Sequence, residues 1–91
     1  MRSVEIVEKA VALANARLAA APSFQVFSST VAQLEYLLSV LRGVESDRSR
    51  LKNIIVGHFA VREFAESDPE LAGALHAAQN VASQAAKELK G

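Results

Sequence analysis

Residues 47–75 constrain the fold more than any other stretch, because they contain an apolar helical run, an acidic turn and the start of another helix. The run is apolar almost all the way round a 3.6-residue period, through Ile54, Ile55, Val56, Phe59, Ala60, Val61 and Phe64. A helix of this kind must be covered on several sides. We therefore expect a central helix, capped by Ser46 or Asp47. Gly57 inside it costs about 1 kcal/mol relative to alanine, which a closely crossing neighbour would offset.

The acidic turn Ser67-Asp68-Pro69-Glu70 marks the start of the next helix. Ser67 and Glu70 have the spacing of a capping box. Alternatively, Asp68 is the N-cap and Pro69 takes the first helical position. The helix that follows has one face of mostly small apolar residues, namely Leu71, Ala74, Leu75, Ala78, Ala82, Ala85 and Leu89, and Gly91 comes after it.

The N-terminal segment is predicted to form an amphipathic helix. Apolar residues recur in it at three- and four-residue spacing, at Val4, Val7, Val11, Ala14 and Leu18. Ser3 is the expected N-cap. Because Pro22 disfavours helical geometry in the residue before it, the helix should end at Ala20 or Ala21.

A second amphipathic helix follows, with its stripe at Phe27, Val31, Leu34, Leu38 and Leu41. We expect it to start between Ser23 and Ser28, where several serines could cap it, and to end at Gly43. Tyr36 lies between the stripe and the polar face, so that it is either a half-buried packing residue or an interface anchor. Both stripes also fit heptads, but for about two repeats only, which is too few for a coiled coil.

With 91 residues, the chain is expected to be a single domain spanning 1–91. Apolar residues make up 51% of it and many of them are alanine, which predicts a thin core between closely approaching helices. The sequence has no alternating strand pattern. The predicted fold class is therefore all-α, a compact antiparallel bundle of about four helices joined by short loops.

The formal net charge is zero, with ten acids and ten bases, so nucleic acid and anionic membranes are disfavoured as partners. The N-terminus carries Glu5 and Glu8 within its apolar pattern, which is unlike a signal peptide. No apolar run approaches the length of a membrane span. We therefore expect a cytoplasmic protein without a membrane or nucleic-acid partner. The absence of cysteine excludes disulfides and thiolate chemistry.

The sequence predicts no enzyme activity, no metal site and no cofactor. His58 and His76 are the only histidines and lack the spacing of a helical ligand pair, so both are read as structural or surface residues. The serines lie at caps, in loops or on polar faces, without a triad arrangement. Acidic side chains cluster at Glu63, Glu66, Asp68 and Glu70. They are either solvated acids beside a helix N-terminus or a recognition surface.

Residues 47–75, the predicted helical hairpin, resemble a family of small immunity proteins. The members of this family are paired with type VI secretion effectors that hydrolyse NAD(P)⁺. The resemblance is carried, in order, by Asp47-Arg48-Ser49, the apolar segment with Gly57, Ala60-Val61-Arg62-Glu63-Phe64, Ser67-Asp68-Pro69-Glu70-Leu71 and Ala74-Leu75. The second helix resembles the same family at Pro22, Phe24, Val26, Gln33-Leu34, Tyr36 and Ser39-Val40-Leu41. Together these residues cover about residues 5–82.

This resemblance implies a cytoplasmic antitoxin that binds the toxin domain of a cognate effector and blocks its nucleotide-binding active site. The predicted partner-binding residues are a physical inference, since acids suit a cleft adapted to phosphates. They are His58, Arg62, Glu63, Glu66, Asp68 and Glu70. The alternative function is a homo-oligomeric helical scaffold or adaptor without a toxin partner, in which the first two helices pair between chains. A homodimer of the immunity protein also remains open.

Overall fold

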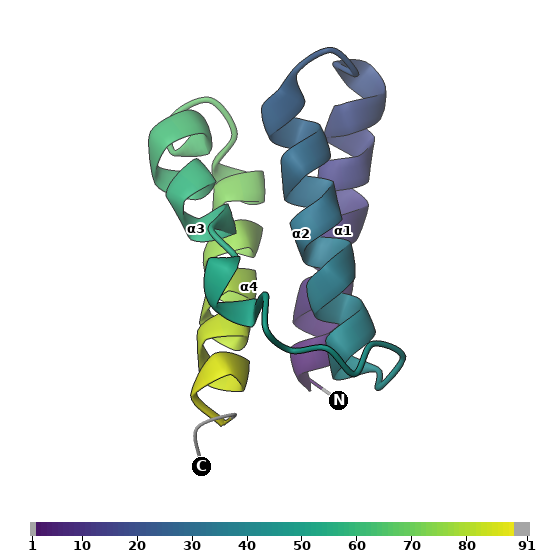
Figure 1. Ribbon diagram of the computed structural model, residues 1–91. Coiled ribbons are helices and arrows are strands. Elements are labelled where there is room, and N and C mark those ends of the chain that lie inside the picture. The colour runs from purple at the N-terminus through teal and green to yellow at the C-terminus, as the bar shows by residue number, and fades with distance from the viewer. Residues whose placement is uncertain (1, 89–91) are drawn as a thin grey trace.

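The computed structural model describes residues 2–88. The helical elements, in chain order, are α1 (Arg2–Ala20), α2 (Gln25–Leu41), the 3₁₀ turn η1 (Leu51–Asn53), α3 (Val56–Phe59), the π-helical segment η2 (Ala60–Phe64) and α4 (Pro69–Glu88). Figure 1 shows two antiparallel hairpins side by side, α1 with α2 and α3–η2 with α4. The prediction of an all-α bundle of about four helices is confirmed. The predictions at Leu89 and Gly91 lie outside the described residues.

The core lies between α1, α2 and α4, and α3–η2 packs against α4. Alanines line much of it, and Ala10, Ala14, Ala78 and Ala82 are fully buried. Larger buried side chains come mainly from α2 and α4, including Leu34, Leu37, Leu71 and Leu75. Small residues at helix contacts let the backbones approach closely, as the alanine content predicted.

The ends of α1 and α2 match the predictions in part. α1 ends at Ala20, as expected, but it already includes Ser3, so Ser3 is not its N-cap. α2 begins at Gln25, inside the predicted range, yet no serine caps it. At its C-terminal end Gly43 has φ +77, and the N–H groups of Gly43 and Val44 donate to the carbonyls of Val40 (3.1 Å) and Ser39 (3.0 Å). This is a Schellman ending, which needs a left-handed residue and so favours glycine.

The loop after α2 is longer than predicted and runs to residue 50. Tyr36 holds it: its hydroxyl donates to the Asp47 carbonyl (2.7 Å) and accepts from the Arg50 N–H (3.3 Å). The Arg50 guanidinium lies 4.3 Å from the centre of the Tyr36 ring. Tyr36 is half-buried against the core, so of the two readings the structure supports the packing residue.

The prediction of one central helix from Asp47 onward is wrong. Asp47 does not cap a helix; its carboxylate accepts the Ser49 N–H (2.9 Å) within the loop. The chain forms only a 3₁₀ turn at residues 51–53 and leaves helical geometry at Ile54 and Ile55 before α3 begins. Local polar residues in the first turns favour the loop, because their side chains compete for backbone hydrogen bonds.

Tertiary hydrogen bonds stabilise the break before α3. The Ile55 N–H donates to Gln33 Oε1 on α2 (2.7 Å), and the Gly57 N–H donates to Gln79 Oε1 on α4 (2.9 Å). These two amide side chains satisfy backbone donors that a continuous helix would have satisfied internally. The predicted close crossing at Gly57 is confirmed, because a Cβ there would lie 2.9 Å from Gln79 Cγ.

Candidate partner-binding surface

The six residues predicted to bind a partner lie along α3–η2, the following turn and the first turn of α4. Five of them are exposed, namely His58, Arg62, Glu63, Glu66 and Glu70, whereas Asp68 is partly buried. They follow one another along the second hairpin, but the structure gives them different surroundings: His58 lines a space with His76 and Gln79 of α4, whereas Glu70 lies beside α1.

Asp68 is a structural residue of the turn. Pro69 is the first residue of α4, and Asp68 Oδ1 accepts the Leu71 N–H at 3.3 Å, as an N-cap does. The Ser67 hydroxyl donates instead to the Glu63 carbonyl (3.1 Å). Of the two readings of this turn, the Asp68–Pro69 start is confirmed and the capping box is wrong.

Arg17, at the end of α1, pairs with two of the predicted acids. Its Nε lies 2.6 Å from Asp68 Oδ2, and its Nη2 lies 3.2 Å from Asp68 Oδ1 and from Glu70 Oε1. The hydrogen bond from Arg17 is the main cause of a lowered pKa at Asp68, and the same bond raises the pKa of Arg17. Because Arg17 is 51 residues from Asp68 in sequence, only the folded hairpins bring the pair together.

The pairing leaves Glu63 and Glu66 as the free acids of this region. Within residues 2–88 neither takes part in an ion pair, and the same holds for Arg62. One positive and two negative charges give these three residues a net charge of −1. Arg17 offsets only one of the two charges of Asp68 and Glu70, so a partner that docks here would meet an acidic surface in which these two carboxylates are already paired.

The two roles of Asp68, as N-cap and as partner of Arg17, predict different effects for two substitutions. Asp68→Asn keeps a good N-cap and loses the charge, whereas Asp68→Ala loses both and should cost about 1 kcal/mol more in unfolding free energy. The folded-state pKa of Asp68 lies below its ordinary value of 3.8. Its charge therefore stabilises the fold above that value, and this contribution is lost as the pH falls through the lowered folded-state pKa.

Urea unfolding of both variants and the wild type between pH 2 and pH 7 would test this prediction. The wild type should lose its advantage over Asp68→Asn in acid, below about pH 4. Glu70→Gln is the matched control, because the Glu70 side chain is mostly exposed and exposed ion pairs contribute little. An advantage of the wild type that stays constant down to pH 2 would contradict the role of the charge.

A groove between α3 and α4 is the feature that the sequence did not predict. It has a volume of about 580 Å³ and is lined by Ile54, Ile55, Gly57, His58, Val61, His76 and Gln79. Ile55 is 43% exposed and Val61 is 62% exposed, although both were expected to be covered as part of the central helix. The break before α3 and the position of α4 together decide which side chains of residues 54–64 face solvent.

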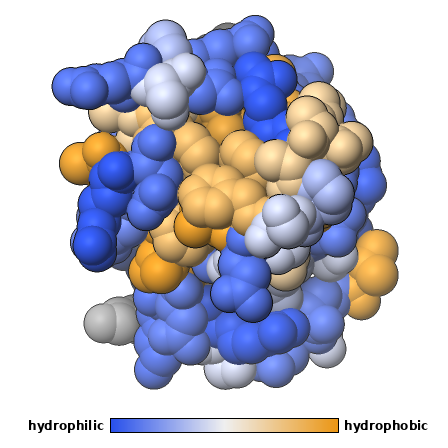
Figure 2. Space-filling view, turned by 90° about the horizontal axis from the view of Figure 1, so that it is seen from above, coloured by the Kyte–Doolittle hydropathy of each residue, from blue (hydrophilic) through white to orange (hydrophobic). Residues whose placement is uncertain are grey.

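The end of the bundle shown in Figure 2 has an apolar area surrounded by hydrophilic residues. Phe24, at the start of α2, is 39% exposed and contacts Phe27 edge to face, with ring centres 5.0 Å apart. Phe27 in turn stacks on Phe64 at 5.4 Å. Phe24 is therefore the outer member of an aromatic chain that reaches from the surface into the core.

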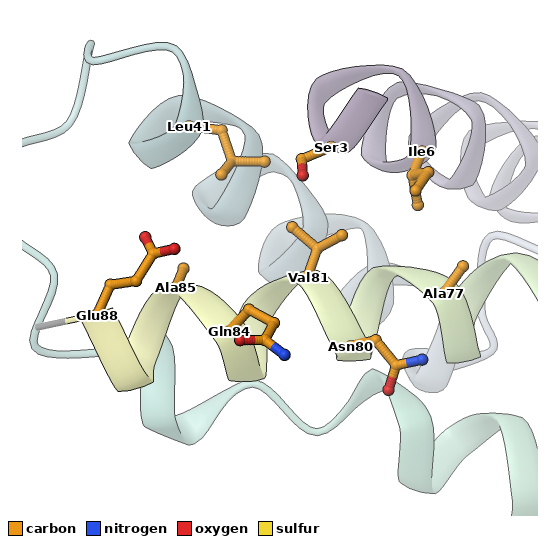
Figure 3. Close-up of a pocket in the computed structure, with 9 residues that line it drawn as sticks. All are labelled: Ser3, Ile6, Leu41, Ala77, Asn80, Val81, Gln84, Ala85 and Glu88. Carbon is orange, nitrogen blue, oxygen red and sulfur yellow. The ribbon is translucent and has the colours of Figure 1, made fainter. Parts of the chain in front are cut away.

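A further groove lies where α1, α2 and α4 meet, and Figure 3 shows the side chains that surround it. It measures about 290 Å³ and is lined mainly by α4, together with Ser3 and Ile6 of α1 and Leu41 of α2. Its only charged lining residue is Glu88.

Across residues 2–88 there is no group of three or more histidine, cysteine or acidic residues that could hold a metal ion. No helix in that range is long and apolar enough to cross a membrane.

Comparison with known proteins identifies the family. The model of the Tsi6 family matches residues 2–84. The immune protein Tsi6 of Pseudomonas aeruginosa PAO1 is 41% identical over 90 residues, which cover 99% of this chain and 96% of that protein.

Solved structures of the same family have the same fold. Tsi6 in the structure of Tse6 in complex with Tsi6 is 40% identical, with a TM-score of 0.91 over 97% of this chain and 94% of that one. A structure of Tsi6 from P. aeruginosa is 43% identical, with a TM-score of 0.84 over 90% and 95% of the two chains. The resemblance to immunity proteins is thus confirmed, and the chain belongs to the Tsi6 family.

Proposed function

We propose that this chain binds the toxin domain of a cognate type VI effector and blocks its nucleotide-binding active site, protecting the cell that makes both proteins. The observation that carries this proposal is the full-length similarity to an immune protein whose structure is known in complex with an effector, Tse6. The chain would act in the cytoplasm, by occupying a surface, without chemistry or a cofactor of its own.

The burial of the first two helices favours this function over a homo-oligomeric scaffold. The scaffold would need the apolar stripes of these helices to pair between chains. Instead, Val7, Ala14, Val31 and Leu34 are buried within the core of a single chain. Sedimentation of the isolated protein would test the point, because a scaffold requires a stable oligomer.

The surface that we propose for toxin binding is the free acidic part of the second hairpin, with Glu63 and Glu66 as its charges and His58 and Arg62 beside them. A cleft that binds phosphates presents basic groups or exposed amides, which such acids would complement. Opposite charges across an interface mainly accelerate association. Asp68 and Glu70 would contribute less, because Arg17 already pairs with both.

Reversal of the two free charges tests this surface. Glu63→Lys combined with Glu66→Lys should slow association with the toxin domain about tenfold at low salt and weaken its salt dependence. Glu35→Lys is the single-site control, since Glu35 is an exposed acid of α2 outside this surface. Stopped-flow association with an inactivated toxin domain would measure the effect. Equal rates for the variants and the wild type would refute the acidic surface.

The biological test of the proposed function is rescue. Cells that express the toxin domain of the cognate effector should survive when the chain is co-expressed. Growth arrest despite soluble, folded immunity protein would contradict the proposed function.

A further inference from the structure

A small pocket, which we call the Arg50 pocket, lies between α2 and the 3₁₀ turn η1. Its volume is about 150 Å³, and it is lined by Ala32, Gln33, Tyr36, Arg50, Asn53 and Ile54. Among these lining residues only Arg50 carries a charge. Pockets that hold small organic ligands measure roughly 300–1,000 Å³, so this one has room for a side chain rather than for a whole cofactor.

Arg50 and Asn53 lie on the same side of η1. Arg50 directly precedes the turn and Asn53 is its last residue, and the Asn53 N–H donates to the Arg50 carbonyl at 2.9 Å. In a 3₁₀ helix, side chains three residues apart lie above one another. The turn therefore brings a guanidinium and an amide to the same pocket.

Tyr36 holds Arg50 in place. The guanidinium carbon of Arg50 lies over the Tyr36 ring, 4.3 Å from its centre, and the Tyr36 hydroxyl accepts the Arg50 backbone N–H at 3.3 Å. A cation–π contact fixes a guanidinium without giving its N–H groups an oxygen acceptor, so these donors stay available. A side chain that is already held in place loses little conformational entropy on binding.

The other polar walls of the pocket are already hydrogen-bonded. Gln33 Oε1 accepts the Ile55 N–H at 2.7 Å, and Gln33 Nε2 donates to Ser29 Oγ at 3.1 Å. The Tyr36 hydroxyl donates to the Asp47 carbonyl at 2.7 Å. These contacts fix the shape of the pocket, and they leave recognition of a ligand to Arg50.

The charge of Arg50 is not paired within the part of the chain that the structure describes. The ion pairs there involve Arg17 and Arg42, and not Arg50. Asp47 is the acid whose pKa responds to Arg50, but the main cause of its lowered pKa is the hydrogen bond with Ser49, and the charge of Arg50 contributes least. The pocket therefore offers a positive charge that needs an anionic partner.

We propose that the Arg50 pocket binds the carboxylate of an aspartate or glutamate from the effector's toxin domain. The Arg50 guanidinium donates to both carboxylate oxygens, the Asn53 amide donates to one of them, and Ile54 contacts the methylene groups. An arginine fork matches the two oxygens and the single charge of a carboxylate, whereas a phosphate carries up to about two charges. This inference rests on the proposed function and adds a contact of opposite sign to Glu63 and Glu66.

The test compares basic residues inside and beside the pocket. Arg50→Gln removes the charge and the paired donors. Arg48→Gln and Lys52→Gln are the matched controls, because these exposed neighbours lose the same charge but do not line the pocket. Since Arg50 is exposed as well, all three variants should fold, which circular dichroism and thermal unfolding would confirm.

Surface plasmon resonance with the inactivated toxin domain, at about 150 mM salt, should show binding at least about tenfold weaker for Arg50→Gln, mainly through faster dissociation. Arg48→Gln and Lys52→Gln should bind within about threefold of the wild type, because exposed charges are screened at this salt concentration. Arg50→Lys should not restore the affinity of the wild type, since lysine keeps the charge but lacks the planar pair of donors.

Substitutions in the toxin domain would identify the acid that enters the pocket. Each surface aspartate or glutamate is replaced in turn by its amide, and each variant is measured against the wild type and against Arg50→Gln. One replacement should weaken binding to the wild type at least about tenfold, but binding to Arg50→Gln less than about twofold, because the pair is already broken.

The outcomes separate the two proposals. If the wild type does not bind the toxin domain, the proposed function is wrong, and so is the occupant of the pocket. If the wild type binds and Arg50→Gln dissociates as slowly as Arg48→Gln, the proposed function stands and the Arg50 pocket is not a contact. If no acid of the toxin domain loses its effect in the presence of Arg50→Gln, the carboxylate is refuted.

Discussion

Replacement of Phe64 by alanine is expected to lower the free energy of unfolding by about 3–5 kcal/mol, the usual loss for a buried phenylalanine. Phe64 is 3% exposed at the end of η2 and stacks on Phe27 of α2, with the two rings nearly parallel at 3°. The ring therefore joins the second hairpin to the first. For a domain of this size the melting temperature should fall by at least about 12 °C.

The control for Phe64 is another member of the same aromatic chain. Phe24 also makes an aromatic contact, with Phe27, but it lies at the surface. Phe24→Ala should therefore cost clearly less than Phe64→Ala, because less apolar surface returns to water. Thermal and urea unfolding of both variants would measure the difference. Equal losses would mean that Phe64 does not join the hairpins through its buried ring.

Leu51→Ala is expected to destabilise the protein by about 2–5 kcal/mol, which is a large effect for a residue in a three-residue 3₁₀ turn. Such a short turn is not stable by itself, because it forms few hydrogen bonds. Leu51 is only 2% exposed and belongs to the core, and η1 contacts α4. The side chain therefore anchors the turn, and with it the long loop after α2.

Lys52→Ala is the matched control for Leu51, since Lys52 is the exposed neighbour in the same turn. Its unfolding free energy should stay within about 0.5 kcal/mol of the wild type. Urea denaturation followed by circular dichroism would measure both variants. A loss at Leu51 as small as that at Lys52 would show that the turn is held by its backbone alone.

The parts of the fold that could be predicted from the sequence are those determined by residues within about one helical turn of each other. Pro22, Gly43 and the Asp68–Pro69 pair act through backbone geometry or the nearest hydrogen bonds, and α1, α2 and α4 end or begin at or beside them. The stripe of α4 was predictable for the same reason, since its spacing alone decides which side chains share a face.

The break at Ile54 and Ile55 and the pairing of Arg17 could not be predicted in this way. The break depends on Gln33 and Gln79, which come from α2 and α4 and have no recognisable spacing from α3. The apolar pattern of residues 54–64 favoured a fully covered helix, and tertiary hydrogen bonds decided otherwise. Consequently the acids of the candidate site were predicted, but the groove between α3 and α4 and the pairing of Asp68 with Arg17 were not.

The two glutamine contacts at the start of α3 have a consequence for protection of the cell. Since one glutamine belongs to each hairpin, the groove has its shape only when both hairpins are assembled. A partly folded copy would therefore lack this groove and would present a different surface to a partner. Protection therefore depends on the number of folded molecules in the cell. A core mutation far from the groove would weaken immunity simply by reducing that number.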